Sequence, residues 1–385
     1  MGNTLKVIYY ITVFLLLLSI SVDANLIKPK LIWEKTFSSQ IMKVCERKDI
    51  DMLKGQKAKF PLSAVMTKKD LLVFNLRGKV IKKISLQGYD QSSISNDGNT
   101  IAAMKGREIT VFSSHNEIIN KIDIAEPQPV VLPQYITFEV SPNGQYIVII
   151  SWFSKQIYFY AVNGKLLATH QFKDLRKTRV LFSKDSSTVL IHVPNFGDGS
   201  SHGFLTCFNM AGELLWRFDH EGCEAEVDVS VNGKNILLAD QNKIYSFNEN
   251  GQILFSKKSK NKINISISDN GKYIAIVDKS DFSISLLDNK YQNIIWKKYT
   301  TGFNMDSLLS SLDISKHHVL LVLNNHWSPL KSDGHFYSYD LSGNQIVYQL
   351  FSKKNIRCQF VYNDFIASNN NELFLYRIDK NINNN

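Results

Sequence analysis

Short apolar stretches separated by tight polar turns recur along almost the whole chain. Each stretch holds four or five nearly continuous apolar residues bounded by polar positions; they lie at 62–66, 100–104, 146–150, 188–192, 235–239, 273–277, 319–323 and 365–368. Runs this short favour strands over helices, and continuous hydrophobicity is typical of strands covered on both faces. Alternating strands precede some of the turns, as at Ile263, Ile265 and Ile267.

The turns that precede these strands share the pattern Ser-x-Asn/Asp-Gly. Full copies stand at 95–98, 141–144, 230–233 and 268–271, with weaker copies at 183–186 and 315–318. Glycine after Asn or Asp supplies the positive φ that a tight hairpin turn requires. The serines are therefore interpreted as turn-forming residues, not as nucleophiles.

A hairpin follows each apolar strand. Its first strand ends in an aromatic or apolar residue: Phe74, Phe112, Tyr160, Phe208, Phe247, Leu287, Tyr339 and Tyr376. After seven of these, a second strand begins six or seven residues later: at Val80, Ile118, Leu166, Leu214, Ile253, Ile294 and Ile346. Each repeat thus holds four antiparallel strands in about 40 to 50 residues, which is the size of a β-propeller blade.

The sequence predicts an all-β fold, a β-propeller of eight four-stranded blades, with seven as the alternative count. The first strand after the leader, 31–37, resembles the outer strands at 213–219 and 293–299, whereas the last repeat lacks an outer strand. Strand 31–37 is therefore expected to complete the C-terminal blade and close the ring, which removes two exposed sheet edges. The expected blades are 38–86, 92–124, 135–172, 179–220, 225–259, 262–300, 307–352, and 356–378 together with 31–37.

Residues 1–24 have the features of a signal peptide. Lys6 precedes an apolar run that extends to Ile20, and Ala24 ends a segment of the kind that a signal peptidase reads. The run is short for a membrane-spanning helix, which needs about 20 apolar residues. The sequence therefore predicts an exported protein, periplasmic or secreted, with residues 25–385 as one propeller domain. The alternative is an uncleaved N-terminal anchor.

Four cysteines in an exported chain permit disulfides. Cys45 is expected near the inner strand of the first blade and Cys358 in that of the last blade, and these two blades meet where the ring closes. A disulfide between them would stabilise the closure by roughly 2–4 kcal/mol. The alternative is two buried free thiols.

Composition and motifs narrow the function without defining it. The net charge is +10, but the lysines are spread along the chain without a dense cluster, and export argues against nucleic acid as a partner. Membrane contact is expected only if the leader is uncleaved, and the protein is expected to be a monomer. The chain has no His-Glu-x-x-His or phosphate-loop motif. We therefore predict no catalytic residue, metal site or cofactor.

Two sequence features resemble known propeller repeats. The Gly-x-x-x-Trp from Gly212 to Trp216, echoed from Gly251 to Phe255, resembles the tryptophan-docking motif of quinoprotein-like (PQQ-type) repeats, and the Ser-x-Asn/Asp-Gly turns resemble those of WD40-like repeats. The chain is similar in length and architecture to the eight-bladed BamB-type lipoproteins, although it lacks their lipid-bearing cysteine. It also lacks the vicinal cysteine pair of quinoprotein dehydrogenases, which argues against PQQ.

Aromatic residues share one position in five outer strands: Trp33, Trp216, Phe255, Trp296 and Tyr348. Their regular recurrence indicates packing between blades, not a ligand cage.

Blade geometry divides the remaining candidates between two faces. One face carries short turns, whereas the other carries the long segments 151–156, 193–203 and 324–335. Function in repeat folds concentrates on the face with insertions. The expected partner-binding residues are Trp152, Phe153, Phe196, His202, His326, Trp327 and His335. Histidines of these loops, with Asp198 or Asp333, would suit a metal or acid–base site, but their spacing matches no metal motif, so exposed loop histidines are the preferred interpretation.

The sequence thus favours a non-catalytic binding or scaffolding propeller of the cell envelope or secreted space. It would engage a protein or polymer through the long-segment face. The alternative is an exported lyase, hydrolase or oxidoreductase with a site at the mouth of the central channel on that face.

Overall fold

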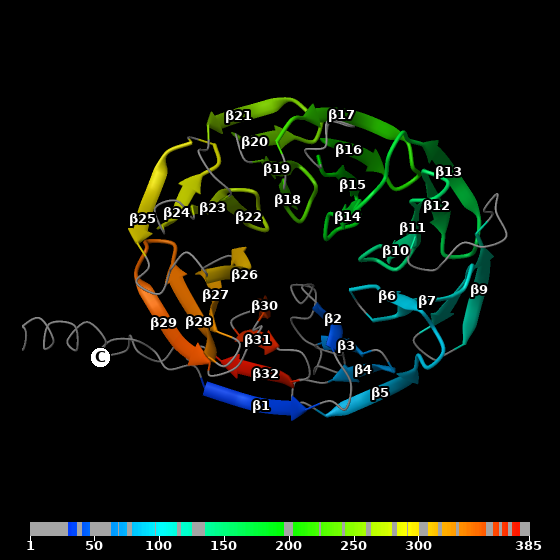
Figure 1. Ribbon diagram of the computed structural model, residues 1–385, viewed down its shortest axis with the longest axis horizontal. Coiled ribbons are helices and arrows are strands. Elements are labelled where there is room, and N and C mark those ends of the chain that lie inside the picture. The colour runs from blue at the N-terminus through cyan, green and yellow to red at the C-terminus, as the bar shows by residue number, and fades with distance from the viewer. Residues whose placement is uncertain are drawn as a thin grey trace, which may run out of the picture.

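The computed structural model describes most of the chain as a closed ring of β-sheets around a central opening (Figure 1). The described residues are 30–36, 41–46, 63–67, 69–74, 79–96, 98–113, 117–124, 135–195, 203–222, 225–240, 243–258, 263–278, 283–290, 292–299, 307–314, 318–328, 331–351, 357–361, 364–368 and 372–377. They form eight four-stranded antiparallel sheets. The expected fold class is therefore confirmed, with eight blades and not seven.

Each blade runs from an inner strand a, beside the opening, to an outer strand d. The strands of blades one to four, in the order a to d, are β2 (Ile41–Glu46), β3 (Ser63–Thr67), β4 (Asp70–Phe74) and β5 (Val80–Ser85); β6 (Gln91–Ile94), β7 (Thr100–Lys105), β8 (Glu108–Ser113) and β9 (Ile118–Asp123); β10 (Ile136–Val140), β11 (Tyr146–Ser151), β12 (Gln156–Ala161) and β13 (Leu166–Gln171); β14 (Arg179–Phe182), β15 (Thr188–Val193), β16 (Gly203–Asn209) and β17 (Leu214–His220).

The other four blades follow the same order. Their strands are β18 (Glu226–Val229), β19 (Asn235–Ala239), β20 (Lys243–Asn248) and β21 (Ile253–Lys258); β22 (Ile263–Ile267), β23 (Tyr273–Asp278), β24 (Ser283–Asp288) and β25 (Ile294–Tyr299); β26 (Ser307–Ile314), β27 (His318–Ser328), β28 (Lys331–Asp340) and β29 (Gln345–Phe351); β30 (Arg357–Val361), β31 (Asp364–Ser368), β32 (Glu372–Arg377) and β1 (Lys30–Thr36).

The ring closes as the sequence predicts. Strand β1 pairs antiparallel with β32, with Leu31 opposite Tyr376 and Thr36 opposite Glu372, so the N-terminal strand is the outer strand of the last blade (Figure 1). The inner strand of blade one, which the sequence leaves poorly defined within 38–61, is β2.

The hydrophobic core is a series of layers between neighbouring blades. One buried cluster joins blades two and three, and others join three to four, four to five, five to six and six to seven. Among the strands whose side chains are described, the b strands β7, β11 and β15 are almost entirely buried, and all six residues of β15 are buried. The outer strands are more exposed, and two of them bury one aromatic residue among exposed ones, Phe255 in β21 and Trp296 in β25. The continuous and alternating patterns of the sequence follow from this difference.

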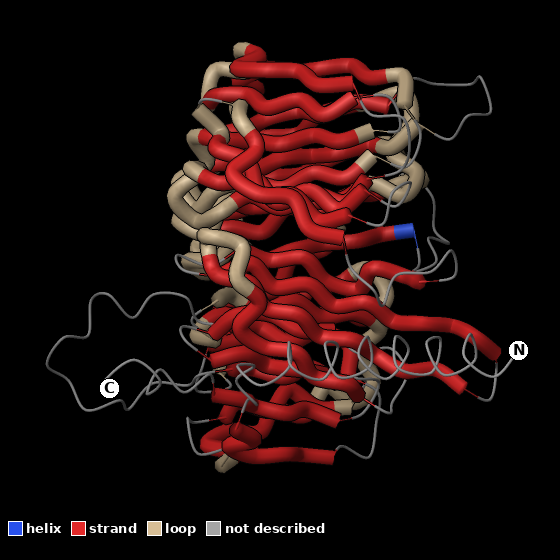
Figure 2. Tube along the Cα trace, turned by 90° about the vertical axis from the view of Figure 1, so that its left-hand side faces the viewer, coloured by secondary structure: helices blue, strands red, loops and turns tan. Residues whose placement is uncertain are grey.

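In blades two to six, hydrogen bonds also link the turns between strands a and b of neighbouring blades. Asn96 N donates to Pro142 O of the next blade at 3.0 Å, and Val231 N donates likewise to Asp269 O. The serine of each described turn forms hydrogen bonds within the turn. Ser141 Oγ, for example, donates to Asn143 Oδ1 at 2.8 Å and accepts from Tyr146 N at 3.0 Å. Seen from its edge, the ring has turns and loops at both faces (Figure 2).

The tryptophans of the outer strands pack against the next blade. Trp216 Nε1 donates to Glu249 O at 2.9 Å, and Trp296 Nε1 donates to Leu341 O at 3.1 Å. These two aromatics therefore pack between blades as expected. The side chains of Trp33 and Tyr348 lie outside the described part of the structure.

Candidate functional site

We name the two faces of the ring by their connections. The turn face carries the a–b and c–d turns, and the long-loop face carries the b–c connections and the links between blades.

The described residues contain no helix that is long and apolar enough to cross a membrane.

Two neighbouring aromatics of blade three differ in their role on the long-loop face. They follow β11 in its connection to β12. Trp152 is half-buried and packs into the cluster between blades three and four, together with Phe172 and Phe204. Phe153 is 47% exposed. The tryptophan thus fixes the connection to the core, while the phenylalanine presents an apolar ring to solvent.

Aromatic packing continues between blades three and four, where Phe204 is buried. Phe172 and Phe204 stack with their ring centroids 5.5 Å apart and their planes 8° apart. The Arg217 guanidinium lies 4.0 Å from the centre of the Phe204 ring and pairs with Asp219 at 2.7 Å. Aromatic and arginine side chains are the residue types enriched at protein interfaces.

A buried histidine pair lies at the long-loop end of blade four. His192 is 1% exposed and His220 is 3% exposed, and their Nε2 atoms are 3.3 Å apart. Strand β16 lies between their strands, and they meet beside Gly203, where an added Cβ would be 2.4 Å from His220 Cε1. His192 ends the apolar stretch predicted at 188–192, and it is not an exposed loop residue because β15 carries it into the sheet.

The hydrogen bonds of this pair indicate which ring nitrogen atoms carry a proton. His220 Nδ1 is 3.1 Å from Gly222 O, and a carbonyl only accepts, so His220 Nδ1 carries the proton. The Nε2 of neutral His220 then accepts from His192 Nε2, and the buried Nδ1 of His192 has no partner. Burial, His220 and Arg179 lower the pKa of His192 to about 3. Burial also lowers the pKa of His220.

The 324–335 segment is largely strand and not the loop that the sequence suggested. β27 and β28 hold 11 and 10 residues and pair as far as Ser328 and Lys331. Since most b and c strands hold about six residues, the hairpin extends roughly 15 Å further at 3.3 Å per residue.

The predicted histidines of blade seven are only partly described. The backbones of His326 and Trp327 lie in β27, but their side chains lie outside the described part of the structure. The His335 ring stacks on Tyr337, with centroids 6.3 Å apart. His335 is therefore part of the packed hairpin and does not close a loop.

The remaining predicted residues fall where the structure gives no side chain. Phe196 and His202 lie outside the described residues. Cys45 lies in β2 and Cys358 in β30, and their side chains, and hence the proposed disulfide, are not described. Cys207 is a buried free thiol whose pKa burial raises to about 12.

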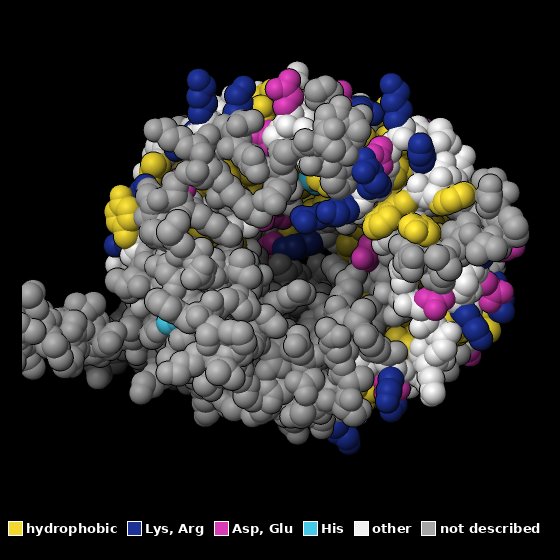
Figure 3. Space-filling view, in the orientation of Figure 1, with side chains coloured by type: hydrophobic (Ala, Val, Ile, Leu, Met, Phe, Trp, Pro, Cys, Tyr) yellow, Lys and Arg dark blue, Asp and Glu magenta, His cyan; other side chains and the backbone are white. Residues whose placement is uncertain are grey.

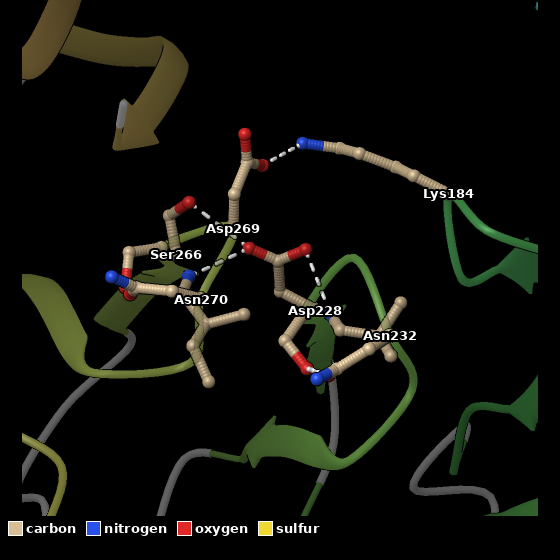
Figure 4. A network of polar contacts seen from close by, with 10 residues as sticks. Lys184, Asp228, Asn232, Ser266, Asp269 and Asn270 are labelled. Carbon is tan, nitrogen blue, oxygen red and sulfur yellow. Dashed lines mark hydrogen bonds and ion pairs between the residues drawn. The ribbon is translucent and has the colours of Figure 1, made fainter. Parts of the chain in front are cut away.

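Polar side chains around the central opening bond to neighbouring inner strands. Asp228 Oδ2 of β18 accepts from Ile267 N at 2.8 Å and from Ser266 Oγ at 3.0 Å (Figure 4). Ser93 Oγ of β6 donates to Glu139 of β10 at 2.7 Å. These bonds satisfy backbone and side-chain groups along the inner sheet edges, which need partners.

Asp228 is half-buried beside the opening. Burial raises its pKa, against the hydrogen bonds from Ile267, Val229 and Ser266, which favour the charged form. Lys184 forms an ion pair with Asp269, two blades away (Figure 4). Among the described residues, no group of three or more His, Cys, Asp or Glu side chains is arranged to hold a metal ion.

Comparisons with known proteins bear on the fold. No protein-family model matches the chain, and no curated protein matches it in sequence. The chain is similar in structure to BamB from Moraxella catarrhalis, with a TM-score of 0.58 and 10% identity over 91% of this chain and 99% of that one.

Two WD40 domains are similar to the same degree. The C-terminal WD40 domain of Sif2 has a TM-score of 0.61 and 12% identity over 92% of this chain and 99% of that one. The WD40 domain of SCAP from fission yeast has a TM-score of 0.61 and 10% identity over 91% and 98%. These similarities show that the chain has the β-propeller fold.

Proposed function

We propose that this chain is a non-catalytic binding or scaffolding propeller that engages a protein or polymer partner through its long-loop face. The observation that carries the proposal is Phe153, an exposed aromatic ring held in a turn that Trp152 fixes to the core. A rigidly presented aromatic buries large area on binding at a low entropic cost.

The opposite face supports this choice. Its a–b turns in blades two to five each donate a hydrogen bond to the next blade, for example from Asn143 N to Ser186 Oγ at 3.0 Å. Backbone groups used for closing the ring are not available to a partner. The carboxylates described near the opening, Glu139, Glu226 and Asp228, also bond to neighbouring blades, which favours a structural role for them over catalysis.

The proposal includes export. Residues 1–24 act as a cleaved leader, and 25–385 form the mature domain in the periplasm or outside the cell. N-terminal sequencing of the protein from its native host tests this part: a mature chain that begins at Asn25 is expected, and a chain that retains Lys6 would contradict it.

Site-specific photocrosslinking tests the binding face. A photoreactive residue replaces Phe153 in one variant and Lys234, an exposed residue of an a–b turn, in the control. In the native host, irradiation of the Phe153 variant is expected to give one discrete adduct that the control lacks. Equal adducts from both positions, or none from Phe153, would contradict the proposed face.

A further inference from the structure

The outer walls of blades five and six share an amphipathic pattern that the proposed function does not use. β21 and β25 each begin with two exposed aliphatic residues and then bury one aromatic. Ile253, Leu254, Ile294 and Ile295 are between 40% and 49% exposed. Exposed apolar residues that occur singly need no explanation, whereas grouped ones indicate a contact surface.

Lysines follow the aliphatic residues on both strands. Lys257 and Lys258 end β21, and Lys297 and Lys298 lie near the end of β25; all four are exposed. Neither strand contains an acidic residue. The wall of these two blades therefore combines an apolar end with a basic end.

In three other outer strands a basic residue pairs with a carboxylate. Lys83 of β5 pairs with Asp70 at 3.0 Å, Lys121 of β9 with Glu108 at 2.8 Å, and Arg217 of β17 with an aspartate of its own strand. Within the described part of the chain, Lys257, Lys258 and Lys298 make no ion pair with a carboxylate. Their charge is therefore directed to solvent.

The two strands form one continuous surface. They belong to adjacent blades (Figure 1), and Gln292 Nε2 of blade six donates to Leu254 O of blade five at 3.4 Å. Tyr299, at the end of β25, is 69% exposed, and Lys297 Nζ lies 5.3 Å from the centre of its ring. Basic and hydrophobic side chains protrude along this part of the rim (Figure 3).

We propose that the outer wall of β21 and β25 is a docking surface for an anionic lipid bilayer. Lysines near such a surface gain electrostatic attraction, aliphatic side chains gain by burial at the boundary between headgroups and acyl chains, and tyrosine is enriched at that depth. A soluble polyanion would use the lysines but not the aliphatic residues. The aliphatic residues therefore favour lipid.

Docking through this wall leaves both faces of the ring open. The outer strands run across the thickness of the ring, so a bilayer that contacts β21 and β25 lies beside the ring and not over its opening (Figures 1 and 2). The lipid surface and the long-loop face are thus separate sites. Each can be tested without the other.

Vesicle flotation of the purified protein, comprising residues 25–385, tests the proposal. The protein is expected to float with vesicles of phosphatidylcholine and phosphatidylglycerol, and not with phosphatidylcholine alone. Replacing Lys257, Lys258, Lys297 and Lys298 by Gln is expected to lower partitioning about 100-fold or more, since each lysine contributes about fivefold. Added salt should weaken binding as it screens the charges.

The aliphatic residues provide the decisive comparison. Replacing Ile253, Leu254, Ile294 and Ile295 by Ser should reduce binding at unchanged charge, whereas Leu214→Ser with Leu215→Ser on β17 is the matched control and should leave it unchanged. No flotation with anionic vesicles would overturn the proposal. So would wild-type flotation by the four-serine variant, which would indicate a surface for polyanions instead. Thermal unfolding of each variant verifies that the ring is intact.

Discussion

Trp216 of blade four lies directly against Gly251 in the c–d turn of blade five. A Cβ built on Gly251 would lie 2.6 Å from Trp216 Cγ, and the backbone of Gly251 has φ of +76°. The indole ring also donates from Nε1 to Glu249 O of the same turn. One tryptophan and one glycine thus join two blades, which explains why the sequence pairs these residue types in successive repeats.

Gly251→Ala should destabilise the protein for two reasons, backbone strain at positive φ and the clash with Trp216. Gly88 provides the control, because its φ is +88° but no atom lies within 4 Å of its added Cβ. We expect Gly251→Ala to cost about 1–3 kcal/mol more than Gly88→Ala. Urea unfolding of both variants measures the difference, and equal losses would mean that the tryptophan adjusts freely.

The closing strand gives a second prediction. Removing residues 25–37 leaves β32 with an unpaired edge, because β1 is its partner. Unpaired edges promote association, so the shortened protein should unfold at a lower temperature and form oligomers. Size-exclusion chromatography and thermal unfolding measure both effects. Removal of 378–385, which takes away no described strand, is the control, and similar behaviour of the two truncations would contradict a role for β1 in closure.

The repetitive part of the fold was predictable because it depends on local rules. Turn glycines and apolar strands recur at near-constant spacing, so the expected starts of the outer strands at Val80, Ile118 and Ile253 are those of β5, β9 and β21. Ring closure was predictable because the segment around Trp33 resembles an outer strand but is not preceded by the inner strands of a blade, whereas the last repeat lacks an outer strand.

The candidate sites were less predictable because they depend on contacts between distant residues. His192 and His220 are 28 positions apart and meet only because Gly203 leaves room between them. The sequence feature that could have indicated this pair is Gly203, the first residue of the buried strand β16, which lies between the two strands that carry the histidines. The segment 324–335 was interpreted as a loop, yet cross-strand pairing extends β27 and β28 through most of it.

Asp228 gives a third prediction. Asp228→Ala should destabilise the protein by about 2–4 kcal/mol, because it leaves the enclosed Ile267 N–H and Ser266 hydroxyl without their acceptor. Asp269→Asn is the comparison, since it removes a partly exposed ion pair with Lys184 and should cost less than about 1 kcal/mol. Chemical unfolding of both variants measures the difference, and a small loss for Asp228→Ala would mean that water replaces the carboxylate.

The histidine pair gives the last prediction, a loss of stability in acid. Folding holds the pKa of His192 at about 3, below its ordinary value of 6.5, and lowers that of His220. Between these pH values the unfolded chain binds more protons than the folded one, so stability rises with pH. The contribution is intact above about pH 6.5 and is lost as pH falls toward 3, by about 1.4 kcal/mol per unit for His192 alone.

Double replacement of His192 and His220 by Gln should therefore flatten the acid side of the stability profile, even if it lowers stability at neutral pH. Urea unfolding at about pH 7.5 and about pH 4.5 measures the slope, with an expected reduction of about 2–3 kcal/mol across the interval. Val193→Ala is the control, because it weakens the same buried strand without removing a titrating group. Val193→Ala should lower the free energy of unfolding equally at both pH values. An unchanged slope in the double variant would mean that the two rings are hydrated and protonate as freely in the folded protein as in the unfolded chain.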